Sequence, residues 1–192
     1  MRTHVSPPPH RRRAAISLVE TVIALSLTTF AASALLTAVS SSVRVSTDSL
    51  HVAIASGLAD QLLDEIALVK FPSATTTGSS GIGRTGFDDL DDFNGYNASP
   101  PQARDGSLIG TEGSGSLATR PQQFQPNPRQ LSRYRQQVTV EKIIESGNSW
   151  VVTTQSSNLR RVTVTISYTD AQGLTTPLCT QVRIFSNVAI AP

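Results

Sequence analysis

The sequence predicts an α+β fold in which one long N-terminal helix packs on a C-terminal antiparallel sheet of about four strands. From Ile16 to Lys70 the chain contains no proline and one glycine, Gly57, which suits a single long helix. From Arg133 onward, apolar and polar residues alternate, and short turn sequences separate the runs. A change from helical to alternating periodicity is typical of a helix followed by a sheet.

Residues 1–15 read as an unstructured leader. They contain three successive prolines and the basic triplet Arg11, Arg12 and Arg13, directly before a long apolar run. Basic residues that flank an apolar span remain on the cytoplasmic side of a membrane. Four of the 16 basic residues lie in this leader and none of the 14 acidic residues does, so the rest of the chain is slightly acidic. Nothing therefore indicates a nucleic-acid partner.

Residues 16–39 have the length and composition of a transmembrane helix. Their only charge is Glu20. A carboxylate within a span costs about 2.5–3.5 kcal/mol on insertion scales, so such a residue usually has a partner and a function. No basic residue lies between Ile16 and Val43, and we therefore expect the partner to come from elsewhere.

The stretch AAISLVETVIAL, residues 14–25, resembles the N-terminal signature of type IV prepilins and type II secretion pseudopilins. The resemblance implies a pilin-like fold and cleavage between Ala15 and Ile16 by a membrane-embedded prepilin peptidase, which would then methylate the amine of Ile16. It also implies that Glu20 pairs with the N-terminal amine of a neighbouring subunit. Ala15 stands where glycine is usual, and Ile16 where phenylalanine is usual.

The same resemblance implies a non-enzymatic structural subunit of a type IV pilus or a type II secretion pseudopilus. Such a subunit is a single-pass protein of the bacterial inner membrane, with a cytoplasmic N-terminus and an extracytoplasmic C-terminal domain. Its partners are the peptidase, other pilin or pseudopilin subunits and, indirectly, an assembly platform and ATPase. A large irregular insertion favours a minor subunit over an abundant shaft subunit.

Two other classes of protein fit parts of the pattern. A signal-anchored extracytoplasmic binding domain that never polymerises would explain the arginines and the span, but not Glu20. A secreted domain released near Ala34 would use the small residues there as a cleavage site, although the apolar run is long for a signal peptide.

Residues 40–71 are expected to form the extracytoplasmic, amphipathic half of the same helix. Apolar residues recur there mostly four apart, and the Phe71-Pro72 pair ends the helix because proline disfavours a helical residue before it. The residues expected to face the sheet are Val52, Leu58, Leu62, Ile66 and Val69.

Residues 72–132 form an irregular segment rich in Gly, Ser and Pro. Residues 85–106 contain spaced aromatic and apolar side chains that could pack against the domain: Phe87, Leu90, Phe93 and Tyr96. The acids Asp88, Asp89, Asp91 and Asp92, followed by Asn94 and Asp105, are the only candidate metal site, and calcium is the cation that such oxygens suit. Their spacing is not that of an EF-hand, and the alternative is a solvated acidic turn.

Residues 133–192 predict four strands, namely Tyr134–Lys142, Trp150–Thr154, Arg161–Tyr168 and Leu178–Phe185. Trp150 is expected in the core or on a face of the sheet. Cys179 is the single cysteine, so no intrachain disulfide can form, and we expect it to be half-buried in the last strand.

No arrangement of residues indicates catalysis. The histidines are His4, His10 and His51, and none has the companions of a Ser-His-Asp or Cys-His site at a meaningful spacing. The glycine-rich stretch from Gly78 to Gly86 follows a helix and lacks a lysine, unlike a phosphate-binding loop. We therefore expect a protein without catalytic activity or cofactor.

Overall fold

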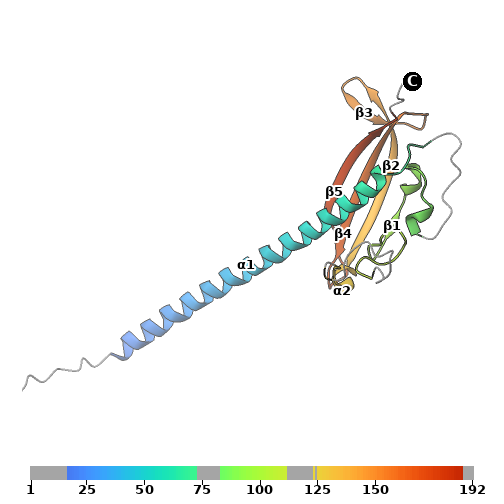
Figure 1. The fold of residues 1–192 in the computed structure, drawn as a ribbon. Coiled ribbons are helices and arrows are strands. Elements are labelled where there is room, and N and C mark those ends of the chain that lie inside the picture. Colours follow the sequence, from blue (N-terminus) through green and yellow to red (C-terminus); the bar gives the residue numbers. More distant parts are fainter. Residues whose placement is uncertain (1–16, 73–82, 112–122, 124, 188–192) are drawn as a thin grey trace, which may run out of the picture. The chain divides into compact units, whose positions relative to one another are not determined.

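The structure is a computed structural model that describes residues 17–72, 83–111, 123 and 125–187 (Figure 1). It confirms the α+β fold, with a long N-terminal helix and an antiparallel sheet. The chain divides into two compact units, Met1–Asp48 and Ser49–Pro192. Each unit is described by itself below.

Helix α1 runs from Leu18 to Ala67 and contributes to both units. It begins and ends within four residues of the predicted limits. Its end is marked by two backbone hydrogen bonds that span three residues instead of four, from Leu68 N to Glu65 O and from Val69 N to Ile66 O. This tightening is common in the last turn of a helix, and Pro72 then prevents the helix from continuing.

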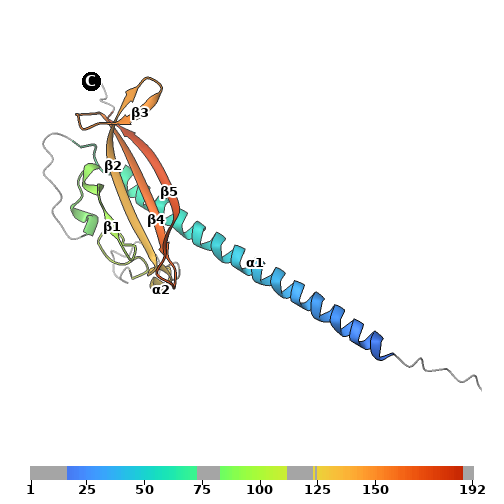
Figure 2. The ribbon, with the colours of Figure 1, turned by 180° about the vertical axis from the view of Figure 1, so that it is seen from behind.

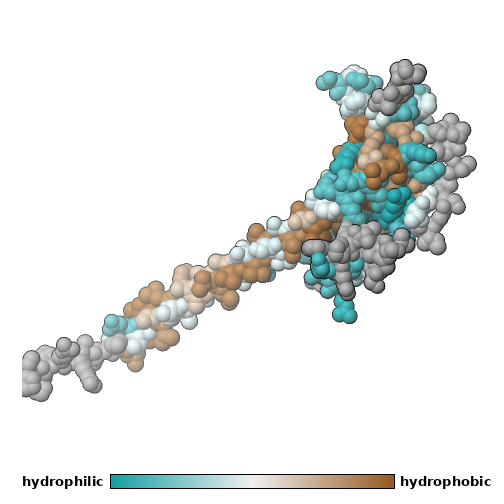
Figure 3. All heavy atoms as spheres, viewed as in Figure 1, coloured by the Kyte–Doolittle hydropathy of each residue, from teal (hydrophilic) through white to brown (hydrophobic). Residues whose placement is uncertain are grey.

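In the first unit, the described chain is the N-terminal part of α1. Its side chains are exposed, and apolar ones recur along the visible side of the helix (Figure 3). Within the described residues, α1 is long and apolar enough to cross a membrane, and none of the apolar window is buried. This is compatible with a single-pass membrane anchor, although an N-terminal signal sequence would meet the same criteria.

In the second unit, the strands form one antiparallel sheet in the order β1-β2-β4-β5. Its members are β1 (Asn97–Ala98), β2 (Tyr134–Ser146), β4 (Leu159–Thr169) and β5 (Thr175–Ser186), and β3 (Ser149–Val152) pairs with the end of β2 outside this order. The four predicted strands are present, most of them longer than predicted, and β1 is a fifth that the sequence did not indicate. Figures 1 and 2 show the C-terminal part of α1 lying across one face of this sheet.

The core lies between that part of α1 and the sheet. Alternate residues of β2 and β4, including Val138, Val162 and Val164, pack in one cluster with the buried face of the helix. The helix contributes Ala55, Leu58, Ala59, Leu62, Leu63 and Ile66. These positions follow the spacing of three and four that keeps residues on one side of a helix. Val52 was predicted to face the sheet but is 48 % exposed. It is on the same side of the helix as this stripe, but it lies before Ala55, the first buried residue of α1.

The described parts of the segment between α1 and β2 pack against the edge of the sheet. It contains the short helices η1 (Gly83–Gly86), η2 (Asp91–Phe93) and α2 (Pro128–Leu131), as well as β1. Leu90 and Phe93 are buried in the core, and Phe87 packs edge-to-face on Phe93, with ring centroids 4.9 Å apart. The expected packing of residues 85–106 is therefore confirmed.

Two single residues of the sheet were also assigned from the sequence. Cys179 lies half-buried in β5, as expected. Trp150 lies on β3 and is 46 % exposed, so it occupies a face of the sheet, one of the two expected places, and not the core. The reason is that β3 extends beyond the sheet order and has only β2 beside it.

Candidate functional site

The residues assigned to processing lie outside the described part of the chain. These are Arg11, Arg12, Arg13, Ala15 and Ile16. Glu20, the residue assigned to assembly, lies in the first turn of α1. Its side chain is exposed and makes no hydrogen bond or ion pair with another described residue. A carboxylate there is favoured by the helix dipole, but no described side chain neutralises its charge.

A row of hydroxyl groups follows Glu20 along α1. Ser26, Thr29, Ser33 and Thr37 each donate a hydrogen bond to the carbonyl oxygen four residues earlier, at 2.7–2.9 Å. We call these four residues the hydroxyl face, because spacings of three and four place them on one side of the helix. Their hydroxyls are satisfied within the helix, so they tolerate surroundings without water. Sequence reasoning missed this face, although the spacing alone could have revealed it.

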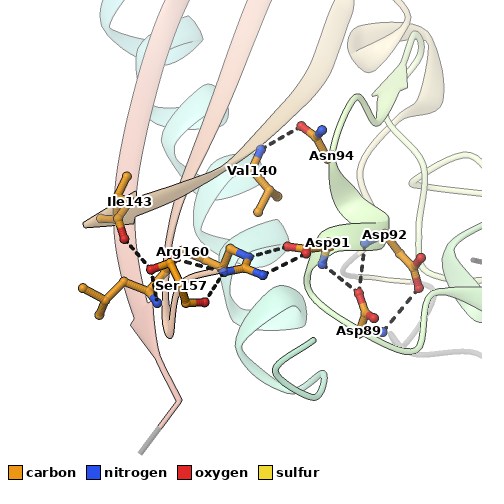
Figure 4. Close-up of polar contacts among 9 residues, drawn as sticks. Asp89, Asp91, Asp92, Asn94, Val140, Ile143, Ser157 and Arg160 are labelled. Atoms are coloured by element: carbon orange, nitrogen blue, oxygen red, sulfur yellow. Dashed lines mark hydrogen bonds and ion pairs between the residues drawn. The ribbon is translucent and has the colours of Figure 1, made fainter. Parts of the chain in front are cut away.

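The acidic segment after η1 is held to the sheet by an ion pair (Figure 4). Asp91 accepts two hydrogen bonds from the guanidinium of Arg160 on β4, at 2.7 and 3.1 Å. The side chain of Arg160 is 6 % exposed, and it also donates to the carbonyl oxygen of Ser157 at 2.7 Å. Its guanidinium lies 5.1 Å from the ring centroid of Phe71. Asp91 is therefore the counter-charge of a buried arginine, and its carboxylate oxygens are already engaged.

The three acids next to Asp91 in the sequence form a separate cluster. One oxygen each of Asp88, Asp89 and Asp92 lies within 4.8 Å of the others. Asp89 accepts from the backbone N–H groups of Asp91 and Asp92, and Asp92 accepts from those of Asp88 and Asp89, at 2.8–3.3 Å. A hydrogen bond with Asp92 raises the pKa of Asp88 above its usual value, and nearby negative charge adds to this.

In these contacts the carboxylates accept hydrogen bonds from the backbone of their own turn, so they stabilise a tight turn. Three carboxylates together can also attract a divalent cation, so calcium binding by Asp88, Asp89 and Asp92 stays a prediction. Asn94 and Asp105, the other candidate ligands, have different contacts: Asn94 Oδ1 accepts from the backbone N–H of Val140 on β2 at 3.0 Å, and Asp105 accepts from Ser107. The segment is thereby fastened to two strands of the sheet.

A second buried arginine joins the same region to α1. Arg84 on η1 donates two hydrogen bonds to Glu65, at 3.0 and 2.8 Å, one to the Tyr96 hydroxyl, and one to the carbonyl oxygen of Gln102. Burial lowers the pKa of Arg84, but the hydrogen bonds and charge of Glu65 outweigh it, so the pKa lies above its usual value. Burial raises the pKa of Tyr96, and Arg84 partly opposes this. Nothing in the sequence pattern singled out Arg84.

Three rings connect α1 to the ends of β2 and β4. The Tyr134 hydroxyl lies 2.5 Å from His51 Nδ1, and the ring of His51 lies 4.4 Å from that of Tyr168. Burial raises the pKa of Tyr134 to about 12, with a smaller contribution from Tyr168. Among the described residues, His51 thus packs as a structural contact of the helix.

A shallow apolar groove lies between α1 and α2. It encloses about 420 Å³ and is lined by residues of both helices and of the chain before α2, namely Ile54, Gly57, Leu58, Gln61, Ile109, Pro126, Gln130 and Leu131. Gly57 is the one glycine of α1, and a methyl group added there would meet no atom within 4 Å. No contact within the described chain therefore requires a glycine at this position.

Comparisons with protein families, with curated proteins and with solved structures gave no match for this chain. The functional argument therefore depends on the residues and the geometry above.

Proposed function

We propose that this chain is a pilin-like structural subunit, a minor pilin or minor pseudopilin of a type IV pilus or a type II secretion pseudopilus. A prepilin peptidase cuts it between Ala15 and Ile16 and methylates Ile16. An assembly platform and ATPase then draw the helix out of the bacterial inner membrane. The extracytoplasmic domain carries no catalytic role in this proposal.

The observation that carries the proposal is the lone carboxylate of Glu20. It lies on an exposed apolar helix that can cross a membrane, and no other described residue pairs with it. An unpaired charge in lipid is costly, so a membrane anchor alone gives no reason to keep it. Pairing with the amine of a neighbouring Ile16 supplies that reason. The fold supports the proposal, since one face of the second half of α1 packs on a sheet and the side chains of the first half are exposed.

Mass spectrometry of the protein from its native membranes tests the processing step. We expect an intact mass and N-terminal fragments that begin at a methylated Ile16. A chain that retains residues 1–15 would instead support the signal-anchored binding domain. A chain that begins beyond Ala34 would support a secreted domain.

Substitution of Glu20 tests the assembly step. Glu20→Ala should abolish recovery of the subunit in sheared filaments or in complexes with other subunits, while the amount inserted in the membrane stays the same. Asp60→Ala is the matched control, because Asp60 is an exposed acid farther along α1, in the second unit. Equal assembly of Glu20→Ala and wild type would refute the proposed role of Glu20.

A further inference from the structure

The described residues of the first unit contain three charged side chains, Glu20, Arg44 and Asp48. Arg44 is the one arginine or lysine of the whole helix α1. Neither the side chain of Glu20 nor that of Arg44 makes a hydrogen bond or ion pair with another described residue, and Arg44 does not pair with Asp48 one turn away. The first unit therefore presents one acid near one end of its apolar segment and one base near the other, both uncompensated.

The spacing of these two charges matches the thickness of a membrane. Glu20 and Arg44 are about 24 residues apart, which is roughly 36 Å along a helix, against about 30 Å for the hydrocarbon core. Two copies side by side at the same height would place Glu20 beside Glu20 and Arg44 beside Arg44, which is repulsive. A copy displaced outward by roughly 36 Å would bring its Glu20 level with Arg44 of the copy that stayed.

The two side chains also point in different directions around the helix. At 3.6 residues per turn, a separation of about 24 residues leaves them about 120° apart. A contact between Glu20 of one copy and Arg44 of another therefore uses two different surfaces. Such a head-to-tail contact does not close on itself in a pair, and with an axial shift it generates an open filament.

The surface around Arg44 has room for such a neighbour. A hollow of about 360 Å³ on α1 is lined by Leu36, Thr37, Ser40, Ser41 and Arg44. The small serines allow a second helix to approach closely, and the hydroxyl face leads up to this hollow along the helix. A guanidinium that is drawn from water into a helix contact needs a carboxylate to compensate its charge.

We infer that Arg44 of one copy binds Glu20 of a second copy that has moved outward by about one membrane thickness, and that this pair sets the axial shift between them. The inference rests on the proposed function, because it requires copies that assemble. A carboxylate has two oxygens with about four acceptor sites, so Glu20 can accept from Arg44 and from a neighbouring amine together. The pair stabilises a subunit that has been extracted from the membrane. It does not form between subunits that are still level in the membrane, whose like charges repel.

Charge variants of Arg44 test the inference. Arg44→Gln should reduce the assembled fraction about tenfold or more, equivalent to at least about 1.4 kcal/mol, with unchanged membrane insertion and peptidase cleavage. Arg44→Lys should retain most of the assembly. Asp48→Asn is the control for a local role within the helix, and we expect it to assemble like wild type. An Asp48→Asn loss equal to that of Arg44→Gln would overturn the pairing with Glu20.

Cross-linking tests the shift while both charges stay in place. Thr21→Cys and Val45→Cys are combined in one chain that also carries Cys179→Ser, so that the two new thiols have the same separation as Glu20 and Arg44. A short bismaleimide should give a ladder of linked chains in assembled material. Each single-cysteine variant should give no ladder, and neither should the double variant when Glu20→Ala blocks assembly.

The outcomes separate the inference from the proposed function. A wild-type chain that is not cleaved and not assembled overturns both. A wild-type chain that assembles, together with an Arg44→Gln variant that assembles equally well, overturns the inference alone. The absence of a 21–45 ladder in assembled material that carries both cysteines has the same meaning.

Discussion

Glu65 on α1 and Arg84 on η1 form a two-fold hydrogen-bonded ion pair in which the arginine side chain is 1 % exposed. This contact ties the segment after the helix back to the helix itself. Removing the carboxylate would leave a buried guanidinium without its counter-charge. We predict that Glu65→Gln lowers the stability of the second unit by about 3–5 kcal/mol.

Hydrogen exchange of the β2 and β4 amides in the full chain in detergent measures this loss. The adjacent acid offers a matched control, since Asp64 pairs with Arg183 at 3.3 Å and both side chains are largely exposed. Asp64→Asn should change stability by less than about 1 kcal/mol. Similar exchange in the two variants would show that the buried pair contributes no more than the exposed one.

The Asp91–Arg160 contact makes a second stability prediction. Arg160 is buried and Asp91 is 37 % exposed, so solvent can compensate part of the lost charge. Asp91→Asn should therefore destabilise the second unit by about 1–3 kcal/mol. Asp88→Asn, at an exposed acid of the same segment, should leave stability close to that of the wild type. The same exchange measurement compares the two variants, and equal losses of stability would contradict the assignment of Asp91 as the counter-charge of Arg160.

Tyr134 gives the protein a dependence on alkaline pH. Its pKa is raised to about 12 in the folded chain from 10.0. Between these values the folded state keeps a proton that the unfolded state loses, so stability should fall as pH rises from about 10 to about 12. An absorbance titration of tyrosinate should show a late step in the wild type. The pKa of Tyr96 is also raised, so this residue adds to the late absorbance change. Tyr134→Phe should reduce the amplitude of the late change, and an unchanged amplitude would assign it to other tyrosines.

Gly57 is a site where substitution should stabilise the isolated subunit. A Cβ there meets nothing within 4 Å, and alanine is favoured over glycine inside a helix. We expect Gly57→Ala to add about 0.5–1 kcal/mol to the stability of α1. Gly110→Ala is the contrasting variant, because φ is +91° there and the new Cβ would collide with the carbonyl oxygen of Pro126.

Thermal unfolding of both variants in detergent, followed by circular dichroism, should shift in opposite directions. If Gly57→Ala raises stability but impairs assembly, the groove beside it contacts another molecule. If Gly57→Ala lowers stability, the helix has a tertiary contact there that the described residues do not include.

The sequence predicted the parts of the fold in which apolar residues recur at a regular helical or strand spacing. The uninterrupted run of α1 and the alternating Val162, Val164 and Ile166 of β4 each bury one face, so pattern and structure agree. The two-residue strand β1 has no pattern that could announce it. The position of β3 outside the sheet order depends on how the turn at Gly147 directs the chain, and alternation does not encode this.

The contacts of the candidate site were less predictable. Arg160 meets Asp91 across 69 positions of sequence, and a lone arginine in either location reads as a surface residue. The acids near Asp91 were interpreted as cation ligands because they are close together in the sequence. The sequence does not show which of these acids faces an arginine in the fold. Glu20, in contrast, could be identified from the sequence alone, because it is a single charge inside an apolar run.

The exposed position of Trp150 makes it a spectroscopic reporter. It is the one tryptophan of the chain and lies on the β2–β3 hairpin, apart from the packed cluster under the sheet. Its emission therefore follows the surroundings of the hairpin tip more than the melting of the interior. A blue shift when subunits come together would identify this hairpin as a surface that loses water on association, with no label attached to the protein.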